Sequence, residues 1–166
     1  LDPSATTQNA IALSTFEYIP QTGKDGKPIR ISGPSEKLDP VQQLMEMLHP
    51  LLQKELISLQ NLSQTDPTLW EDRERILLLL NSYEQCEWAF DRLRDVWLGD
   101  KSLLLPLKRP DDEDAYGIFR SDIEDFASTG KKILIAPMQA IGRGYNILNQ
   151  QGKAAFGAIY FLTRPM

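Results

Sequence analysis

The fold is decided by residues 74–93, ERILLLLNSYEQCEWAFDRL. Residues 75–80 hold five consecutive apolar side chains, which is typical of a parallel strand that is buried on both faces. Ser82 and Gln85 then have the spacing of a capping box, in which side chains satisfy the free backbone groups at the start of a helix. The stretch therefore predicts a buried strand that leads directly into an amphipathic helix over residues 83–97.

The same alternation of strand and helix continues towards the C-terminus. Apolar runs predict further strands over residues 102–107, 132–136 and 157–162, and Pro106 indicates an edge position for the first of them. Periodic apolar side chains predict a helix over residues 115–128. Because strands alternate with helices, the sequence predicts the α/β fold class, with a mostly parallel sheet flanked by helices.

The N-terminal part of the chain has a different pattern. Residues 10–19 and 29–32 are rich in strand-forming side chains and flank a segment with turn chemistry, so they predict a β-hairpin. Apolar residues then recur at helical spacing over residues 40–59. Asp39 is placed to cap this helix, and Pro50 predicts that the helix is kinked or split.

We expect two units along the chain, a hairpin and helical appendage over residues 1–70 and an α/β domain over residues 71–166. The chain begins at Leu1 without an initiator methionine and stops at Met166, just after a strongly apolar stretch. We therefore expect a fragment of a larger protein, with an α/β domain that is incomplete at its C-terminus.

The composition is that of an ordinary soluble domain, with 42% hydrophobic and 25% charged residues. No apolar run approaches the ~20 residues of a membrane-spanning helix, so we expect no membrane contact. A single cysteine fits a reducing compartment, so we expect a cytoplasmic location. The net charge of −5 argues against nucleic-acid binding over the whole surface but leaves room for a local phosphate site. The single cysteine, Cys86, excludes an internal disulfide and a Cys-based zinc cluster.

Residues 131–147, KKILIAPMQAIGRGYNI, combine a buried strand with a polar loop that contains two glycines. In parallel α/β sheets, ligands bind where loops leave the carboxyl ends of the strands. Gly142 and Gly144 let the backbone approach a phosphate or a sugar closely. Arg143 can pair with phosphate oxygens, and Asn146 can hydrogen-bond a ribose or another loop. On the residues alone, the alternative is a structural turn that carries a surface arginine.

Three segments together resemble the second RecA-like domain of superfamily 2 nucleic-acid helicases. Residues 131–147 resemble motif V, in which a strand is followed by a loop ending in an Arg-Gly pair. Residues 74–93 resemble the motif IV strand and the helix after it. Residues 119–136, FRSDIEDFASTGKKILIA, have the usual helix and glycine turn before the motif V strand. The resemblance covers residues 72–166 and implies a RecA-like fold for this part.

The chain also departs from the family pattern. Pro137 stands where the family commonly has threonine, and Asn146 stands where it has aspartate. The loop is one residue longer than the DEAD-box form, so the resemblance is to a divergent branch similar to the DinG-like helicases. A second interpretation assigns residues 139–143, QAIGR, to the start of motif VI, which carries the arginine finger.

The resemblance implies where ligands bind. ATP with Mg would be held jointly with a first RecA-like domain outside this chain, through Arg143, Gly144 and Asn146. No metal ligand is expected within the chain itself. Single- or double-stranded nucleic acid would be contacted by residues that follow the two strands, namely Asn81, Ser82, Tyr83, Met138 and Gln139.

Three functions are compatible with these patterns. The leading one is a fragment of an ATP-dependent nucleic-acid helicase or translocase that supplies the second RecA-like domain. The chain has no GxxxxGK motif followed by Ser or Thr, so we expect no ATP hydrolysis by this fragment alone. The alternative is a catalytically inactive RecA-like interaction module of a larger protein, which Pro137 and Asn146 favour. A third is an unrelated nucleotide-binding domain built on a parallel sheet.

Overall fold

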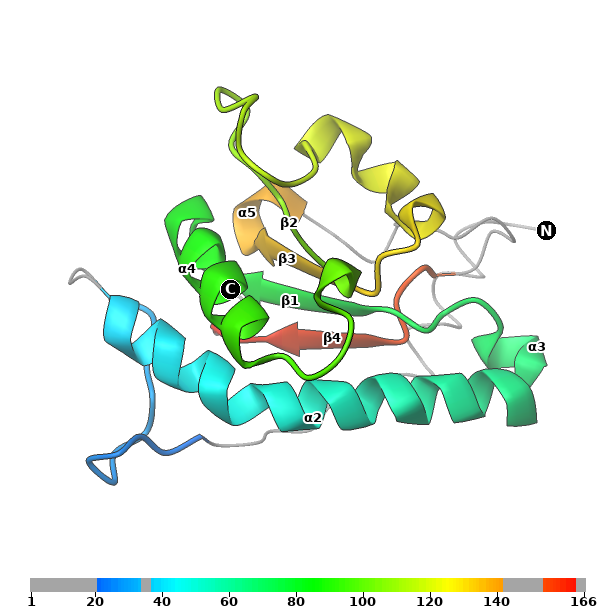
Figure 1. The fold of residues 1–166 in the computed structure, drawn as a ribbon, viewed down its shortest axis with the longest axis horizontal. Helices are drawn as coiled ribbons and strands as arrows, with labels where there is room; N and C mark the ends of the chain where they lie inside the picture. Colours follow the sequence, from blue (N-terminus) through cyan, green and yellow to red (C-terminus); the bar gives the residue numbers. More distant parts are fainter. Residues whose placement is uncertain (1–20, 34–36, 142–153, 164–166) are drawn as a thin grey trace.

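The fold was analysed in a computed structural model, which describes residues 21–33, 37–141 and 154–163 (Figure 1). Its centre is a four-stranded, all-parallel sheet with the strand order β2-β3-β1-β4. The sheet and the helices on its faces confirm the predicted α/β class. The strands are β1 (Ile76–Leu80), β2 (Leu104–Pro106), β3 (Ile133–Pro137) and β4 (Ala158–Phe161).

The four predicted strands all form, and their register is regular. Ile76 lies opposite Ile133 of β3 on one side and Ala158 of β4 on the other. Among the described strands β2 pairs with β3 alone, so it lies at the sheet edge, which confirms the prediction made from Pro106. Proline is tolerated there because an edge strand has one row of N–H groups that need no partner in the sheet.

The two faces of the sheet are covered by different segments, because side chains alternate along each strand. Ile76, Leu78 and Leu80 pack with α2 (Leu38–Thr65) and α4 (Tyr83–Val96). The other face packs with η2 (Arg120–Thr129), a 3-10 helix, and with the short helix α5 (Met138–Ile141). Both faces are therefore buried, which explains the continuous apolar runs in β1 and β3.

The predicted helix over residues 115–128 is wrong in its start and its type, since η2 begins at Arg120 and is a 3-10 helix. The reason lies in a tertiary contact. The N–H of Ile118 donates to the carbonyl of Pro106 at 3.0 Å, and the N–H of Lys108 donates to the carbonyl of Ile118 at 2.9 Å. These bonds hold the segment beside β2. Gly117, at φ +147°, adopts a backbone conformation outside the right-handed helix.

The helix α2 differs from its prediction at both ends and is not split by Pro50. It begins at Leu38, so Asp39 lies in the first turn and is not the capping residue. It is continuous to Thr65, and Figure 1 shows it bending along its length. Buried side chains before and after the proline, such as Met45 and Leu52, stabilise both halves against the core, which outweighs the hydrogen bond that Pro50 removes.

The predicted hairpin is only partly within the described residues. Residues 10–19 lie outside them, and residues 29–32 are not a strand. The turn chemistry is confirmed, because an antiparallel bridge joins Thr22 to Pro28 and the N–H of Gly23 donates to the carbonyl of Lys27 at 2.8 Å. A short helix, α3 (Pro67–Trp70), follows α2.

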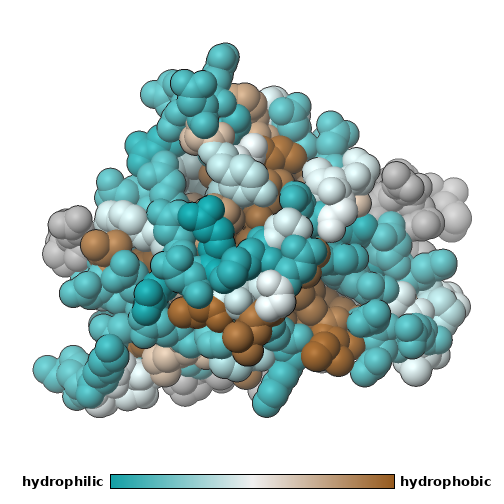
Figure 2. All heavy atoms as spheres, viewed as in Figure 1, coloured by the Kyte–Doolittle hydropathy of each residue, from teal (hydrophilic) through white to brown (hydrophobic). Residues whose placement is uncertain are grey.

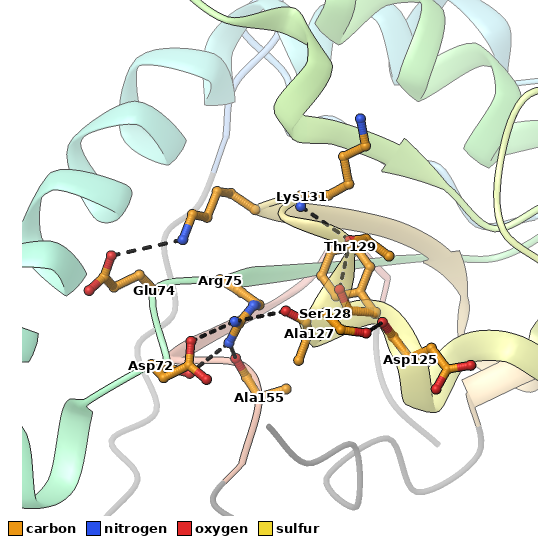
Figure 3. A network of polar contacts seen from close by, with 11 residues as sticks. Asp72, Glu74, Arg75, Asp125, Ala127, Ser128, Thr129, Lys131 and Ala155 are labelled. Carbon is orange, nitrogen blue, oxygen red and sulfur yellow. Dashed lines mark hydrogen bonds and ion pairs between the residues drawn. The ribbon is translucent and has the colours of Figure 1, made fainter. Parts of the chain in front are cut away.

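The amino-terminal edge of the sheet is closed by the buried side chain of Arg75 (Figure 3). Its guanidinium donates to the carbonyl oxygens of Asp72, Ala155 and Ala127 at 2.6, 3.2 and 3.1 Å. It also pairs with the Asp72 carboxylate at 2.7 Å. These contacts join the turn before β1, the end of η2 and the segment before β4, so this edge is structural.

Few large apolar side chains are exposed in the part of the chain that the structure describes. Ile57 and Leu98 are the most exposed of them among the described residues, at 59% and 70%. Figure 2 shows apolar groups near α2 that hydrophilic side chains separate from one another. None of the described helices has the length and the apolar character that crossing a bilayer requires.

Candidate functional site

The candidate site lies at the carboxyl ends of β1 and β3. Leu80 and Pro137, the last residues of these strands, are opposite each other in the parallel register. The segments that follow them therefore leave the sheet side by side. In this way the structure brings together the five residues that the sequence predicted for nucleic-acid binding, Asn81, Ser82, Tyr83, Met138 and Gln139.

The chain leaves these two strands towards opposite faces of the sheet. After β1 it enters α4, which packs with α2 on the face of Leu78. After β3 it enters α5, whose Ala140 packs on the opposite face with Leu77. Such a divergence between neighbouring parallel strands is the topological switch point, where open α/β sheets bind their ligands.

The start of α4 provides free backbone donors. The Ser82 hydroxyl accepts a hydrogen bond from the N–H of Gln85 at 3.2 Å, which confirms the Ser82 half of the predicted capping box. The Gln85 side chain does not return the bond to Ser82 but accepts from the N–H of Asn81. In the described part of the chain no acceptor lies against the N–H groups of Tyr83 and Glu84, as expected for a first helical turn. These groups and the helix dipole attract an anion, whereas the exposed Glu84 carboxylate in the same turn repels it.

Asn81 has a structural contact that the sequence did not reveal. Its side-chain nitrogen donates to the carbonyl of Ile31 at 3.1 Å, and its backbone N–H donates to the side-chain oxygen of Gln85 at 3.1 Å. Gln85 itself is buried and donates to the same Ile31 carbonyl at 2.7 Å. The Asn81 amide therefore holds the N-terminal segment in place, which leaves Ser82 as the more accessible of the two for a ligand.

The segment after β3 is helical where a loop was predicted. Met138 and Gln139 lie in the single turn α5, in which Met138 is half-buried against the core and Gln139 is exposed. A strand leads into this turn, as the motif V interpretation requires, and Gln139 lies in a helix, as the motif VI interpretation requires. Arg143, Gly144 and Asn146, the predicted ATP contacts, lie outside the described residues.

Two other reactive side chains near the site are not available to a ligand, because one forms an ion pair and the other is buried. The Arg109 side chain, just after β2, pairs with Glu87 of α4 at 3.2 Å. Burial raises the pKa of the Cys86 thiol far above its usual range, and the Glu87 charge adds to the rise, so this thiol is inert as a nucleophile. Among the described residues, no group of three or more His, Cys, Asp or Glu side chains could hold a metal ion.

Comparison with known proteins adds no family to this picture. No protein-family model, no curated protein and no solved structure matches the chain. The class that the fold defines is an α/β protein with an all-parallel, four-stranded sheet and a candidate ligand site at its switch point.

Proposed function

We propose that this chain supplies the second RecA-like domain of an ATP-dependent nucleic-acid helicase or translocase. One observation carries the proposal. The two segments that resemble motifs IV and V form neighbouring parallel strands, whose last residues, Leu80 and Pro137, are in register. The RecA-like arrangement requires these two motifs to act at one edge of the sheet, and chain segments that leave neighbouring parallel strands meet there.

In this proposal the chain holds a nucleic-acid strand by its phosphates. The free N–H groups at the start of α4 and the exposed Ser82 and Gln139 side chains form the contact. Such a contact reads no base edges, so binding is indifferent to sequence and weakens with salt. ATP with Mg would be bound jointly with a first RecA-like domain, to which this chain contributes Arg143, Gly144 and Asn146.

The alternative is a catalytically inactive RecA-like interaction module. It is favoured by Pro137, which ends β3 and is buried where the helicase pattern has a threonine. Proline brings neither a hydroxyl nor a backbone N–H to the site, so one polar contact of the family is lost.

A charge-reversal experiment tests the proposed contact. The double variant Ser82→Asp, Gln139→Glu keeps a good capping residue in α4 but adds two negative charges beside the phosphates. The matched control, Gln60→Glu with Asn61→Asp, adds the same charge on the exposed surface of α2. Both are compared with wild type in the protein that includes the partner domain, by anisotropy of a labelled single strand at low salt.

We expect the site variant to bind about tenfold or more weakly, since two phosphate contacts are lost, while the control binds like wild type. Equal affinities for all three proteins would place the contact elsewhere. Strand binding without strand-stimulated ATP hydrolysis would favour the inactive module.

A further inference from the structure

The segment over residues 21–33, QTGKDGKPIRISG, has a fixed place beside the candidate site, and we call it the basic strap. The side chain of Ile31 is buried in the core shared by α2 and α4. Its carbonyl accepts hydrogen bonds from Asn81 and Gln85, which flank Ser82 at the start of α4. The strap is therefore attached directly to the element that carries the proposed phosphate contact.

The tip of the strap is an ordered turn. The N–H of Gly23 donates to the carbonyl of Lys27 at 2.8 Å, and the N–H of Ile29 donates to the carbonyl of Gln21 at 2.9 Å. Figure 1 shows this turn at the lower left, on the side towards which the strand arrows point, with the first turns of α2 between it and the sheet in this view. In Figure 2 it is a hydrophilic projection at the lower left. The carboxyl ends of the strands and the strap thus face the same side of the molecule.

The strap is cationic in an otherwise acidic chain. It contains Lys24, Lys27 and Arg30, all exposed, against one carboxylate, whereas the whole chain has a net charge of −5. That carboxylate, Asp25, accepts a hydrogen bond from the Lys27 backbone N–H at 3.0 Å, so it is engaged with the turn itself.

Five of the twelve lysines and arginines that the structure describes outside the strap pair with carboxylates, whereas none of the three in the strap does. No carboxylate of a described residue lies within ion-pair distance of Lys24, Lys27 or Arg30. By contrast, ion pairs link Arg75 with Asp72, Arg92 with Glu46, Arg109 with Glu87 and Lys132 with Glu74. Three exposed cations in one short segment, two on the turn and one just after it, are available for an external anion.

We infer that the basic strap binds the phosphate backbone of a single-stranded nucleic acid, which continues onto it from the ends of β1 and β3. This inference rests on the proposed function and adds a second contact to it. A nucleic acid fits better than a membrane, because the apolar side chains of the strap, Ile29 and Ile31, are half-buried and buried and cannot insert into lipid. It fits better than an added peptide strand, because residues 29–33 are not part of a sheet edge.

The test removes the three charges and measures the salt dependence of binding. The variant Lys24→Gln, Lys27→Gln, Arg30→Gln is compared with wild type and with Lys54→Gln, Arg120→Gln, Lys131→Gln, which removes the same charge outside the strap. A third variant, Lys24→Arg, Lys27→Arg, Arg30→Lys, keeps the charge. The probe is a labelled oligothymidylate, titrated against the full 166-residue chain at several salt concentrations.

We expect the strap variant to lose affinity at low salt and its slope of log affinity against log salt to become shallower by about 2, since each lost contact with a single strand accounts for about 0.7. The control and the charge-keeping variant should match wild type. If the strap variant also matches wild type, the inference is wrong. Competition by polyglutamate as effective as by unlabelled oligothymidylate at equal charge would also overturn it, in favour of an acidic peptide.

Measuring the Ser82→Asp, Gln139→Glu variant in parallel separates this inference from the proposed function. If that variant binds weakly and the strap variant binds normally, the strap inference fails and the proposed contact stands. If only the strap variant binds weakly, the strap contact is supported and the contact at the ends of β1 and β3 fails.

Discussion

The side-chain amide of Gln85 donates a hydrogen bond of 2.7 Å to the carbonyl of Ile31, which lies 54 residues earlier in the chain. The same side chain accepts from the backbone N–H of Asn81 at 3.1 Å. One buried amide therefore joins the basic strap, the end of β1 and the first turn of α4. Because all three meet at the candidate site, the geometry of that site depends on a residue that need not touch a ligand.

Replacing Gln85 by leucine should destabilise the protein by about 1–3 kcal/mol, because it leaves the Asn81 N–H without its partner and the Ile31 carbonyl with one donor fewer. Urea unfolding gives the free energy directly. The control Gln60→Leu, at an exposed position of α2, should change it by no more than about 0.5 kcal/mol. Equal effects of the two substitutions would contradict the structural role of Gln85.

The sheet could be predicted from the sequence because its signal is local. The apolar runs in β1 and β3 have the length of strands and require burial on both faces, whatever the rest of the chain does. The cap of α4 was equally predictable, since Ser82 and Gln85 are three residues apart.

The errors arise where distant contacts override local preference. Ile118 is held beside β2 by the Pro106 carbonyl, so the helical periodicity around it does not produce a helix. Pro50 stays within one helix because the core stabilises both sides of it. The contact of Asn81 with the Ile31 carbonyl also depends on a distant segment, so no local pattern reveals it. The predicted ligand contact of Asn81, which came from the resemblance to motif IV, stays a prediction.

Replacing Arg75 by methionine should destabilise the protein by about 3 kcal/mol. The substitution removes this donor from three backbone carbonyls and removes the cation that pairs with the Asp72 carboxylate. This value is at the low end for a buried pair, because Asp72 is partly exposed and water replaces some of the lost contact. Arg94→Met, which breaks an exposed pair with Asp91, is the control and should cost under about 0.5 kcal/mol. A loss for Arg75→Met no larger than that of the control would contradict the structural role of the Arg75 contacts drawn in Figure 3.

The buried Cys86 should make stability fall at alkaline pH. Its pKa is raised in the folded protein, first by burial and then by Glu87, so the folded thiol keeps its proton while the unfolded thiol loses it above about pH 8.5. The unfolded state then binds fewer protons, and the free energy of unfolding decreases by up to about 1.4 kcal/mol for each further pH unit. Urea unfolding between pH 8 and about pH 10 should show this slope, reduced in Cys86→Ala. Identical slopes in the two proteins would show that the thiol ionises in the folded state.

The purified chain should not hydrolyse ATP by itself, because its sequence contains no GxxxxGK motif followed by Ser or Thr to hold the phosphates. The measurement is phosphate release by the isolated chain and by its Arg143→Ala variant, and both should equal the buffer blank. If the wild-type chain hydrolyses ATP faster than the variant, the phosphate loop need not lie in another domain, and the prediction is wrong.

The same substitution in the protein with both domains separates the two interpretations of residues 137–147. An arginine finger, as in motif VI, contributes about 10³-fold or more to turnover, so its loss should nearly abolish hydrolysis. A motif V residue supports ribose and phosphate contacts, and its loss should instead weaken hydrolysis by a much smaller factor and leave strand binding at Ser82 and Gln139 measurable.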